Sequence, residues 1–199
     1  GHSPKATVDA IKAQLDNGIT AMLPTENALA VSAELAGRFG LPLWQYTVSA
    51  TDANRHVIRY SRLITGRSKI IVIDRCYHGS VDETFATLDA AGNTIAREGN
   101  IGAPVPLKET TRVVEFNDLA GMEDALKHGD VAAILMEPAM TNVGIVLPED
   151  GYLLAVGELA KKYGAKWIID ETHTISASAG GMTAQLGLKP DFLTIGKAI

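Results

Sequence analysis

Short apolar runs alternate with longer amphipathic segments along most of the chain, and this alternation constrains the fold more than any other feature. The runs Lys69–Ile73 and Val131–Met136 are almost continuously apolar, which is typical of parallel strands buried on both faces. The segments between such runs repeat apolar residues at helical spacing and end at glycines. The sequence therefore predicts an α/β fold, in which a mostly parallel sheet carries helices on both faces.

Capping residues and periodicity place the individual elements. Helices with their caps are expected at residues 4–16, 25–40, 49–66, 119–128 and 151–163, and strands at 43–48, 69–73, 113–116, 131–136, 167–170 and 192–195. A polar, glycine-containing stretch at 89–111 separates two of these units. The helix faces expected to be buried carry Val8, Ile11 and Leu15 in the first helix, Ala28, Val31, Leu35 and Phe39 in the second, and Ala53, Val57, Tyr60 and Ile64 in the third.

The composition excludes several classes of function. Of 199 residues, 18 are Lys or Arg and 23 are Asp or Glu, and a net charge of −5 argues against nucleic acid as a partner. The longest apolar runs are far shorter than the roughly 20 residues of a membrane helix, so no membrane span is expected. The single Cys76 cannot form an internal disulfide, which fits a reducing cytoplasm. The five histidines show no metal-binding spacing, so no metal site is expected.

Polar clusters follow the predicted strands, at the edge where open α/β sheets bind ligands. Ser49, Ala50 and Thr51 stand where a strand ends and a helix begins. Free backbone N–H groups and the helix dipole would suit a phosphate there, although an ordinary helix cap is the alternative. Tyr77 and His78 follow another predicted strand, and Tyr77 suits either stacking on a flat ligand or a place in the core.

Two further residues at strand ends are chemically informative. Asp170 could bind a metal, orient a base, pair with a protonated heterocyclic nitrogen or be a satisfied loop carboxylate. Lys197 follows a predicted strand and Gly196, where desolvation would favour a nucleophilic amine, although a solvated lysine is the alternative. A phosphate cup, a stacking ring, a carboxylate and a lysine are together the parts that a pyridoxal phosphate enzyme needs.

An ordered set of motifs supports that combination. It comprises Pro24-Thr25-Glu26-Asn27, Thr65-Gly66-Arg67-Ser68-Lys69-Ile70, Cys76-Tyr77-His78-Gly79, Glu137-Pro138, Asn142, Gly151-Tyr152-Leu153, Asp170-Glu171, Lys189-Pro190-Asp191 and Gly196-Lys197. With these motifs the sequence resembles the class III (subgroup II) pyridoxal-phosphate-dependent aminotransferases of fold type I. The glutamate-1-semialdehyde aminomutase branch of that family is the most similar, and the likeness covers nearly the whole chain.

The resemblance implies pyridoxal 5'-phosphate as the cofactor and assigns a role to each candidate residue. Lys197 would hold the cofactor as a Schiff base, and Asp170 would pair with its ring nitrogen; these two residues are the expected catalytic groups. Tyr77 would stack on one face of the ring and Thr172, where the family usually has Val, would pack on the other. The remaining cofactor-binding residues would be Ser49, Ala50 and Thr51 around the phosphate, His78 beside Tyr77, and Asn142 near the ring hydroxyl.

Two departures from the family pattern stand out. Ala50 replaces a glycine of the phosphate turn, and His173-Thr174-Ile175-Ser176-Ala177 replaces a run such as Gly-Phe-Arg, so the substrate side of the pocket is expected to differ from that of the aminomutase. Residues 1–199 are expected to be the central part of a cofactor-binding large domain, with an N-terminal segment and a C-terminal small domain outside it.

The predicted activity is transfer of an amino group between an amino acid or amine and an oxo acid or aldehyde. An intramolecular amino shift, as in the aminomutase branch, is the alternative within enzymes, and a non-catalytic α/β ligand-binding module is the alternative from another class. The resemblance also implies a homodimer whose partners are small molecules, an amino donor and a carbonyl acceptor.

Overall fold

The structure is a computed structural model that describes residues 2–19 and 22–197. The chain divides into two compact units, Gly1–Gln45 and Tyr46–Lys197, and each is described by itself.

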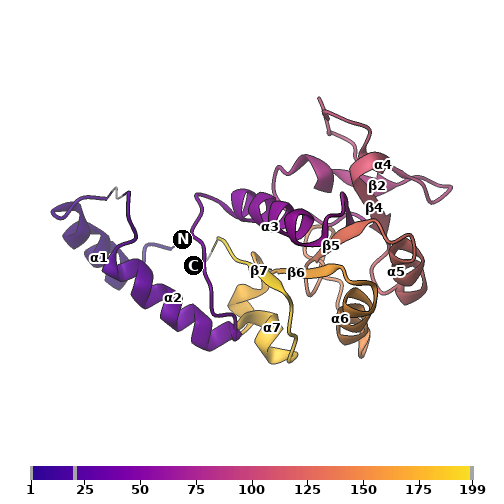
Figure 1. The fold of residues 1–199 in the computed structure, drawn as a ribbon. Helices are drawn as coiled ribbons and strands as arrows, with labels where there is room; N and C mark the ends of the chain where they lie inside the picture. The colour runs from indigo at the N-terminus through magenta and orange to yellow at the C-terminus, as the bar shows by residue number, and fades with distance from the viewer. Residues whose placement is uncertain (1, 20–21, 198–199) are drawn as a thin grey trace. The chain divides into compact units, whose positions relative to one another are not determined.

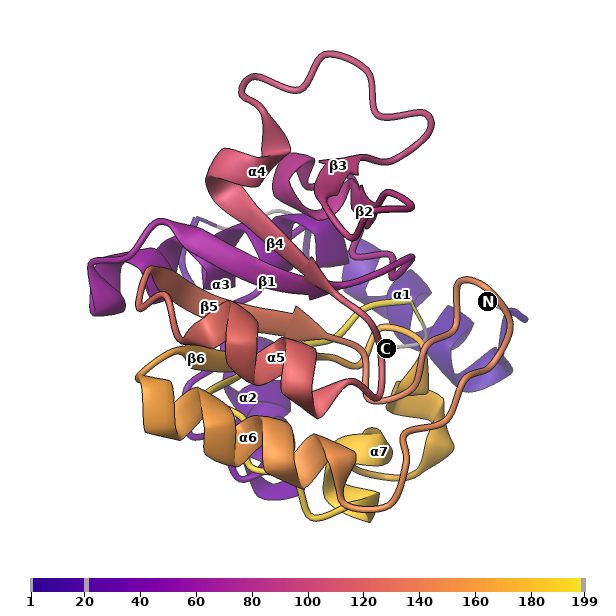
Figure 2. The same ribbon diagram turned by 90° about the vertical axis from the view of Figure 1, so that its right-hand side faces the viewer.

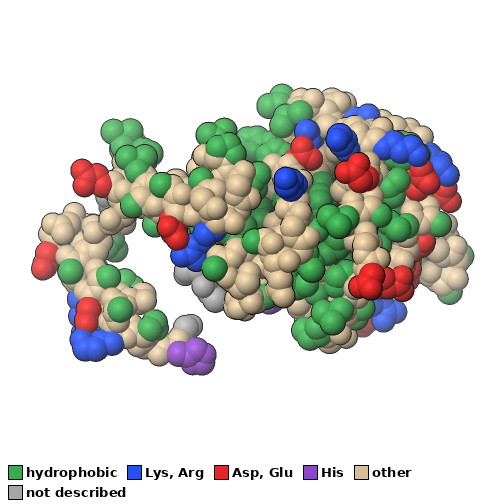
Figure 3. All heavy atoms as spheres, turned by 90° about the horizontal axis from the view of Figure 1, so that it is seen from below, with side chains coloured by type: hydrophobic (Ala, Val, Ile, Leu, Met, Phe, Trp, Pro, Cys, Tyr) green, Lys and Arg blue, Asp and Glu red, His purple; other side chains and the backbone are tan. Residues whose placement is uncertain are grey.

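The first unit contains two helices, α1 (Lys5–Leu15) and α2 (Glu26–Phe39), close to their predicted positions (Figure 1). The Thr25 hydroxyl caps α2 by accepting a hydrogen bond from the Ala28 N–H at 3.4 Å, and Gly40 ends it with φ of 69°. The prediction that each helix buries an apolar face is wrong for the described residues, none of which is buried in α1 or α2. Two helices enclose no interior by themselves, so hydrophobic side chains stay at the surface (left part of Figure 3).

The second unit is built on a sheet of five parallel strands in the order β4–β1–β5–β6–β7. The strands are β1 (Lys69–Ile73), β4 (Thr111–Val114), β5 (Val131–Met136), β6 (Lys166–Asp170) and β7 (Phe192–Thr194). Helix α3 (Ala50–Thr65) lies on one face, and α5 (Leu119–Leu126) and α6 (Tyr152–Tyr163) lie on the other (Figure 2). The predicted α/β class, parallel sheet and two helical layers are confirmed.

The core lies between these layers, and its centre is strand β5, in which every residue is buried. Helix α3 meets the sheet through Asn54, Ile58 and Ser61, and two of these three side chains are polar. The apolar face predicted for this helix is only partly right: Val57 packs against the core, but Tyr60 and Ile64 are 41% and 59% exposed. Hydrophobic periodicity does not predict that the polar Asn54 lies on the buried face. Asn54 is buried because it has a hydrogen-bond partner on the sheet.

Two local predictions are also wrong. Residues 43–48 form no strand, and neither sheet of the described residues includes them. The stretch 89–111 contains regular structure that its polar composition concealed: β3 (Thr94–Ala96) pairs antiparallel with β2 (Ala86–Leu88), and α4 (Leu107–Thr110) follows. Elements of three or four residues are too short to show a period. The short helices η1 (Asp82–Thr84), η2 (Thr174–Ala177) and α7 (Gly181–Gln185) were missed for the same reason.

Helix α6 approaches the sheet most closely at Gly157, and this contact generates a prediction. A Cβ at Gly157 would lie 2.8 Å from the buried Trp167 ring. Gly157→Ala should therefore destabilise the second unit by about 1–3 kcal/mol through overpacking, although alanine favours a helix by about 1 kcal/mol. Gly37→Ala in α2 is the control, because no atom lies within 4 Å of the added methyl group, and it should stabilise its own helix. Amide hydrogen exchange in α6 and α2 reports each effect, and slower exchange in both helices would contradict the packing argument.

Candidate active site

The carboxyl ends of β1, β6 and β7 meet the first turns of α3 at one edge of the sheet. Asp170, the last residue of β6, is paired in register with Thr194 of β7. His78, in the loop after β1, places its Nδ1 2.8 Å from Asp170 Oδ2. Asn54 of α3 places its Nδ2 2.9 Å from the same oxygen. Helix α3 and the loop after β1, which are distant in sequence, therefore converge on this carboxylate at the end of β6.

Asp170 accepts three hydrogen bonds from the described residues and is only 2% exposed. His78 and Asn54 donate to Oδ2, and the backbone N–H of Thr172 donates to Oδ1 at 3.0 Å. An ionised carboxylate offers about four acceptor positions on its two oxygens. One position on Oδ1 is thus left for a further donor.

Asp170 and His78 form a coupled ion pair. Burial alone would raise the pKa of the Asp170 carboxyl, but the hydrogen bond and charge of His78, with the Thr172 and Asn54 donors, lower that pKa to about 2. Burial would likewise lower the pKa of the His78 imidazole, but the Cys76 side chain and the Asp170 carboxylate raise it well above its usual value of 6.5. Asp170 is therefore an ionised acceptor at neutral pH despite its burial.

Ser49 forms the N-cap of α3, and its Oγ accepts a hydrogen bond from the Asp52 N–H at 3.2 Å. The first intrahelical bond runs from the Ala53 N–H to the Ser49 carbonyl at 3.0 Å. The N–H groups of Ala50 and Thr51 therefore precede the helical hydrogen-bonding pattern, at the positive end of the helix dipole. The helix-cap interpretation of Ser49 is what the structure shows, and it leaves the next two N–H groups suited to an anion.

Two glycines let the strand-end loops touch this first turn. A Cβ at Gly79, whose φ is 79°, would lie 2.0 Å from Thr51 Oγ1, and a Cβ at Gly196 would lie 2.8 Å from the Ala50 Cβ. The loop that carries Tyr77 and the loop that carries Lys197 are thus packed against α3. Ala50 can replace the family's glycine because its methyl group fills the space left by Gly196.

The other predicted residues are less tightly held. Tyr77 is 41% exposed and makes an edge-on contact with Phe85. Asn142 is exposed and donates a hydrogen bond to the Arg75 carbonyl at 3.1 Å. Lys197 is exposed and has a left-handed φ of 58°.

Thr172 is buried beside Gly196, and its hydroxyl has no hydrogen-bond partner in the described part of the chain. Polar groups that are buried without a partner are uncommon in native structures. This hydroxyl is therefore available to a ligand bound next to Asp170.

Sequence reasoning missed Asn54 as a site residue. The hydrophobic pattern turned the predicted buried face of α3 away from it, but the spacing of Asn54, Ile58 and Ser61 fits one helix face and was a usable signal. Glu137 and His173 were noted in the sequence, but their link was not: the Thr141 hydroxyl donates to Glu137 Oε2 at 2.5 Å and lies 2.6 Å from His173 Nδ1.

Glu171 was recognised only as part of a motif, and the structure gives it a structural role. Its buried carboxylate accepts hydrogen bonds from the Thr174 and Thr183 hydroxyls and from the Thr183 N–H, each at 2.5 Å. These bonds hold the start of α7 against the end of β6. Asp170 and Glu171, although adjacent, therefore serve different purposes.

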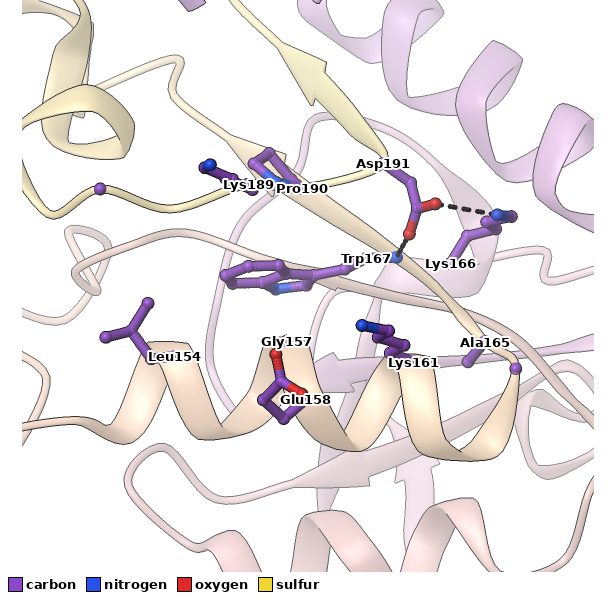
Figure 4. A pocket seen from close by; sticks show the side chains of 12 residues that line it. Leu154, Gly157, Glu158, Lys161, Ala165, Lys166, Trp167, Lys189, Pro190 and Asp191 are labelled. Atoms are coloured by element: carbon purple, nitrogen blue, oxygen red, sulfur yellow. Dashed lines mark hydrogen bonds and ion pairs between the residues drawn. The ribbon is translucent and has the colours of Figure 1, made fainter. Parts of the chain in front are cut away.

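A surface hollow of about 530 Å³ lies at the opposite end of β6 (Figure 4). It is bordered by Trp167 near the start of the strand, by Lys161 of α6 and by Asp191. The Asp191 carboxylate accepts hydrogen bonds from Lys166 Nζ at 2.8 Å and from the Trp167 N–H at 2.9 Å. The candidate site residues do not line this hollow.

Comparisons with known proteins agree with the fold described above. Residues 1–199 match the family described as aminotransferase class-III. A glutamate-1-semialdehyde 2,1-aminomutase of Nitrosospira multiformis is 35% identical over 205 aligned positions, covering 100% of this chain and 48% of that protein. The chain thus spans about half the length of the curated relatives it matches.

Solved structures give the same result. A glutamate-1-semialdehyde-aminomutase from Pseudomonas aeruginosa has a TM-score of 0.95 and 52% identity, covering 98% of this chain and 43% of that one. An omega-transaminase from Sphaerobacter thermophilus has a TM-score of 0.88 and 30% identity, covering 99% and 47%. The architecture is that of the fold type I pyridoxal-phosphate-dependent transferases. Within this class, the chain belongs to the class-III aminotransferase family.

The ion pair at the centre of the site predicts a pH dependence of stability. The lowered pKa of Asp170 stabilises the fold above about pH 4, and this contribution is lost as the pH falls toward 2. The raised pKa of His78 stabilises the fold below about pH 6.5, and this contribution is lost as the pH rises through the folded-state pKa. His78→Asn, which keeps a neutral donor, should therefore cost roughly 1–3 kcal/mol near pH 5.5 and less at either extreme.

Urea denaturation from pH 3 to pH 9 measures this difference. His128→Asn is the control because His128 lies on the surface, and it should follow the parent protein at every pH. A cost of His78→Asn that does not vary with pH would show that no ion pair contributes.

Proposed function

We propose that this chain is the cofactor-binding part of a pyridoxal-phosphate-dependent aminotransferase, which moves an amino group between an amino acid or amine and an oxo acid or aldehyde. The observation that carries the proposal is the ionised, buried Asp170 with one unused acceptor position, on the strand next to the one that leads to Lys197. Membership of the class-III aminotransferase family supports it.

The residues present fit the proposed cofactor. The unused acceptor of Asp170 suits a protonated ring nitrogen, and the unpartnered Thr172 hydroxyl lies in the same buried corner. The Ala50 and Thr51 N–H groups, at the start of α3, suit the phosphate. Tyr77 is exposed enough to stack on the ring, and we retain Ser49, His78 and Asn142 as neighbours of the cofactor. These donors and acceptors support pyridoxal 5'-phosphate as the cofactor.

Each of the site residues would then have its own role. Lys197 would attach the cofactor covalently through its ε-amino group and, once released by an incoming amine, carry a proton between the reacting carbons. Asp170 would hold a proton on the ring nitrogen, because its nearby negative charge favours the protonated form. When bound, the cofactor supplies the electron sink for this chemistry. His78 and Asn54 would keep Asp170 in its ionised state and orientation.

An intramolecular amino shift is the second candidate, because the relative from Nitrosospira multiformis is named a glutamate-1-semialdehyde 2,1-aminomutase and the solved structure from Pseudomonas aeruginosa a glutamate-1-semialdehyde-aminomutase. The two activities differ in the fate of the amino group. Incubation with a 15N-labelled amino donor and an oxo acid separates them, because only a transaminase transfers the label to the second molecule.

We further propose that residues 1–199 are the central part of the large domain of a longer enzyme, that this enzyme is a homodimer, and that it works in the cytoplasm. The first proposal is supported by the relatives, about half of whose length this chain spans. The dimer follows from the family resemblance, and the free, buried Cys76 is compatible with a reducing compartment. No helix in the described part of the chain has the length and apolar character needed to cross a membrane.

The covalent attachment can be tested directly. Borohydride reduction of the full protein loaded with pyridoxal phosphate should fix the cofactor mass on the peptide that contains Lys197. Lys197→Arg should abolish the labelling and the yellow colour together. Lys189→Arg, an exposed lysine eight residues upstream, should leave both intact. A label on another lysine, or a colourless parent protein, would refute the proposal and favour a non-catalytic module.

The oligomeric state has its own test. Sedimentation equilibrium of the full protein should give the mass of two protomers or a multiple of it. A stable monomer with full activity would refute the homodimer.

A further inference from the structure

We infer that Asn54 is a positioning residue for Asp170, and that Thr194 fixes the direction in which the Asn54 amide points. The inference rests on the proposed function, because it adds a residue to the same site. It deepens that proposal by identifying what holds the acceptor for the ring nitrogen in place.

The hydrogen bonds around Asn54 allow only one orientation of its amide. The Thr194 hydroxyl lies 2.8 Å from Asn54 Oδ1 and must donate to it, because a carbonyl oxygen has no proton. The two protons of Nδ2 then point to the His78 carbonyl at 3.1 Å and to Asp170 Oδ2 at 2.9 Å. A flipped amide would place Oδ1 against two other acceptors and leave the Thr194 hydroxyl without its acceptor.

Burial makes this arrangement strict. Asn54 is 0% exposed, and Thr194, His78 and Asp170 are each 2% exposed. A polar group that loses its partner here cannot form a hydrogen bond to water instead, so the free energy of each lost bond is not compensated. Asn54 therefore does more than fill space between α3 and the sheet.

The same bonds link Asp170 to the strand that precedes Lys197. Thr194 is paired in register with Asp170 and lies three residues before Lys197. Hydrogen bonds thus lead from the strand that precedes Lys197, through α3, to the carboxylate and to the backbone of the loop that carries Tyr77. Asn54 and His78 fix the position of Asp170 Oδ2. The unused acceptor position on Asp170 Oδ1 therefore points in one defined direction.

Four substitutions separate positioning from simple packing. Thr194→Val removes the hydroxyl and keeps the shape, Thr194→Ser keeps the hydroxyl, and Thr65→Val removes a hydroxyl at the far end of α3, where it donates to the Ser61 carbonyl at 2.7 Å. Asn54→Leu removes the amide itself. The first variant retains a β-branched residue in β7, so it provides a readout if Asn54→Leu fails to fold.

The first measurement uses the full protein without cofactor. Nitrogen-15 NMR follows exchange of the Asn54 side-chain amide protons with solvent, which should be slow in the parent protein. Exchange should accelerate at least about tenfold in Thr194→Val, since a bond worth a factor of about ten is lost. It should stay close to the parent rate in Thr194→Ser and Thr65→Val. Equal exchange in the Val and Ser variants at position 194 would overturn the role of Thr194.

The second measurement adds pyridoxal phosphate. Thr194→Val and Asn54→Leu should each weaken its binding about tenfold and make the absorbance of the bound cofactor vary between pH 6 and pH 9, as a less firmly held ring proton is lost. Thr194→Ser should restore the parent values. Parent-like affinity and absorbance in the variants would overturn the positioning role. If the parent protein fails to bind the cofactor, the proposed function fails, and amide exchange alone then decides whether Thr194 and Asn54 are linked as inferred.

Discussion

The structure of the site depends on keeping a charged carboxylate at the buried end of a parallel strand. Moving an ionised group out of water costs several kcal/mol unless donors replace the water that it loses. Asp170 obtains those donors from three other parts of the chain, namely His78, Asn54 and the Thr172 backbone. The requirement therefore determines how the loop after β1, helix α3 and the end of β6 are placed relative to one another.

Close packing around that carboxylate explains several features that otherwise look unrelated. Gly79 and Gly196 are small because the loops after β1 and β7 pass within contact distance of Thr51 and Ala50. Helix α3 buries a polar Asn54 while Ile64 stays exposed, because the helix is oriented by its hydrogen bonds to the sheet edge as well as by hydrophobic contact. The same orientation directs the α3 N-terminus to the edge that carries Asp170, so the N–H groups at the start of the helix and the ionised carboxylate lie at one edge of the sheet.

The elements that depend on local information could be predicted from the sequence. Strands β1 and β5 are recognisable because both of their faces are buried, and α3 because Ser49 and Gly66 cap it. Asp170 and Lys197 were predicted as site residues because they follow predicted strands. The face of α3, the absence of a strand at 43–48 and the contacts of Asn54 could not be predicted, because each depends on a partner far away in the sequence. Asn54 and Asp170, for example, are 116 residues apart.

The central claim is that Asp170 stays ionised in order to hold a proton on the ring nitrogen of a bound cofactor. Nitrogen-15 NMR of the full protein, loaded with pyridoxal phosphate labelled at that nitrogen, tests it most directly. The account predicts the chemical shift of a protonated ring nitrogen, constant from pH 6 to pH 9, since the carboxyl group has a pKa of about 2 in the fold. A ring nitrogen that loses its proton within this range, as it does in the free cofactor, would contradict the account.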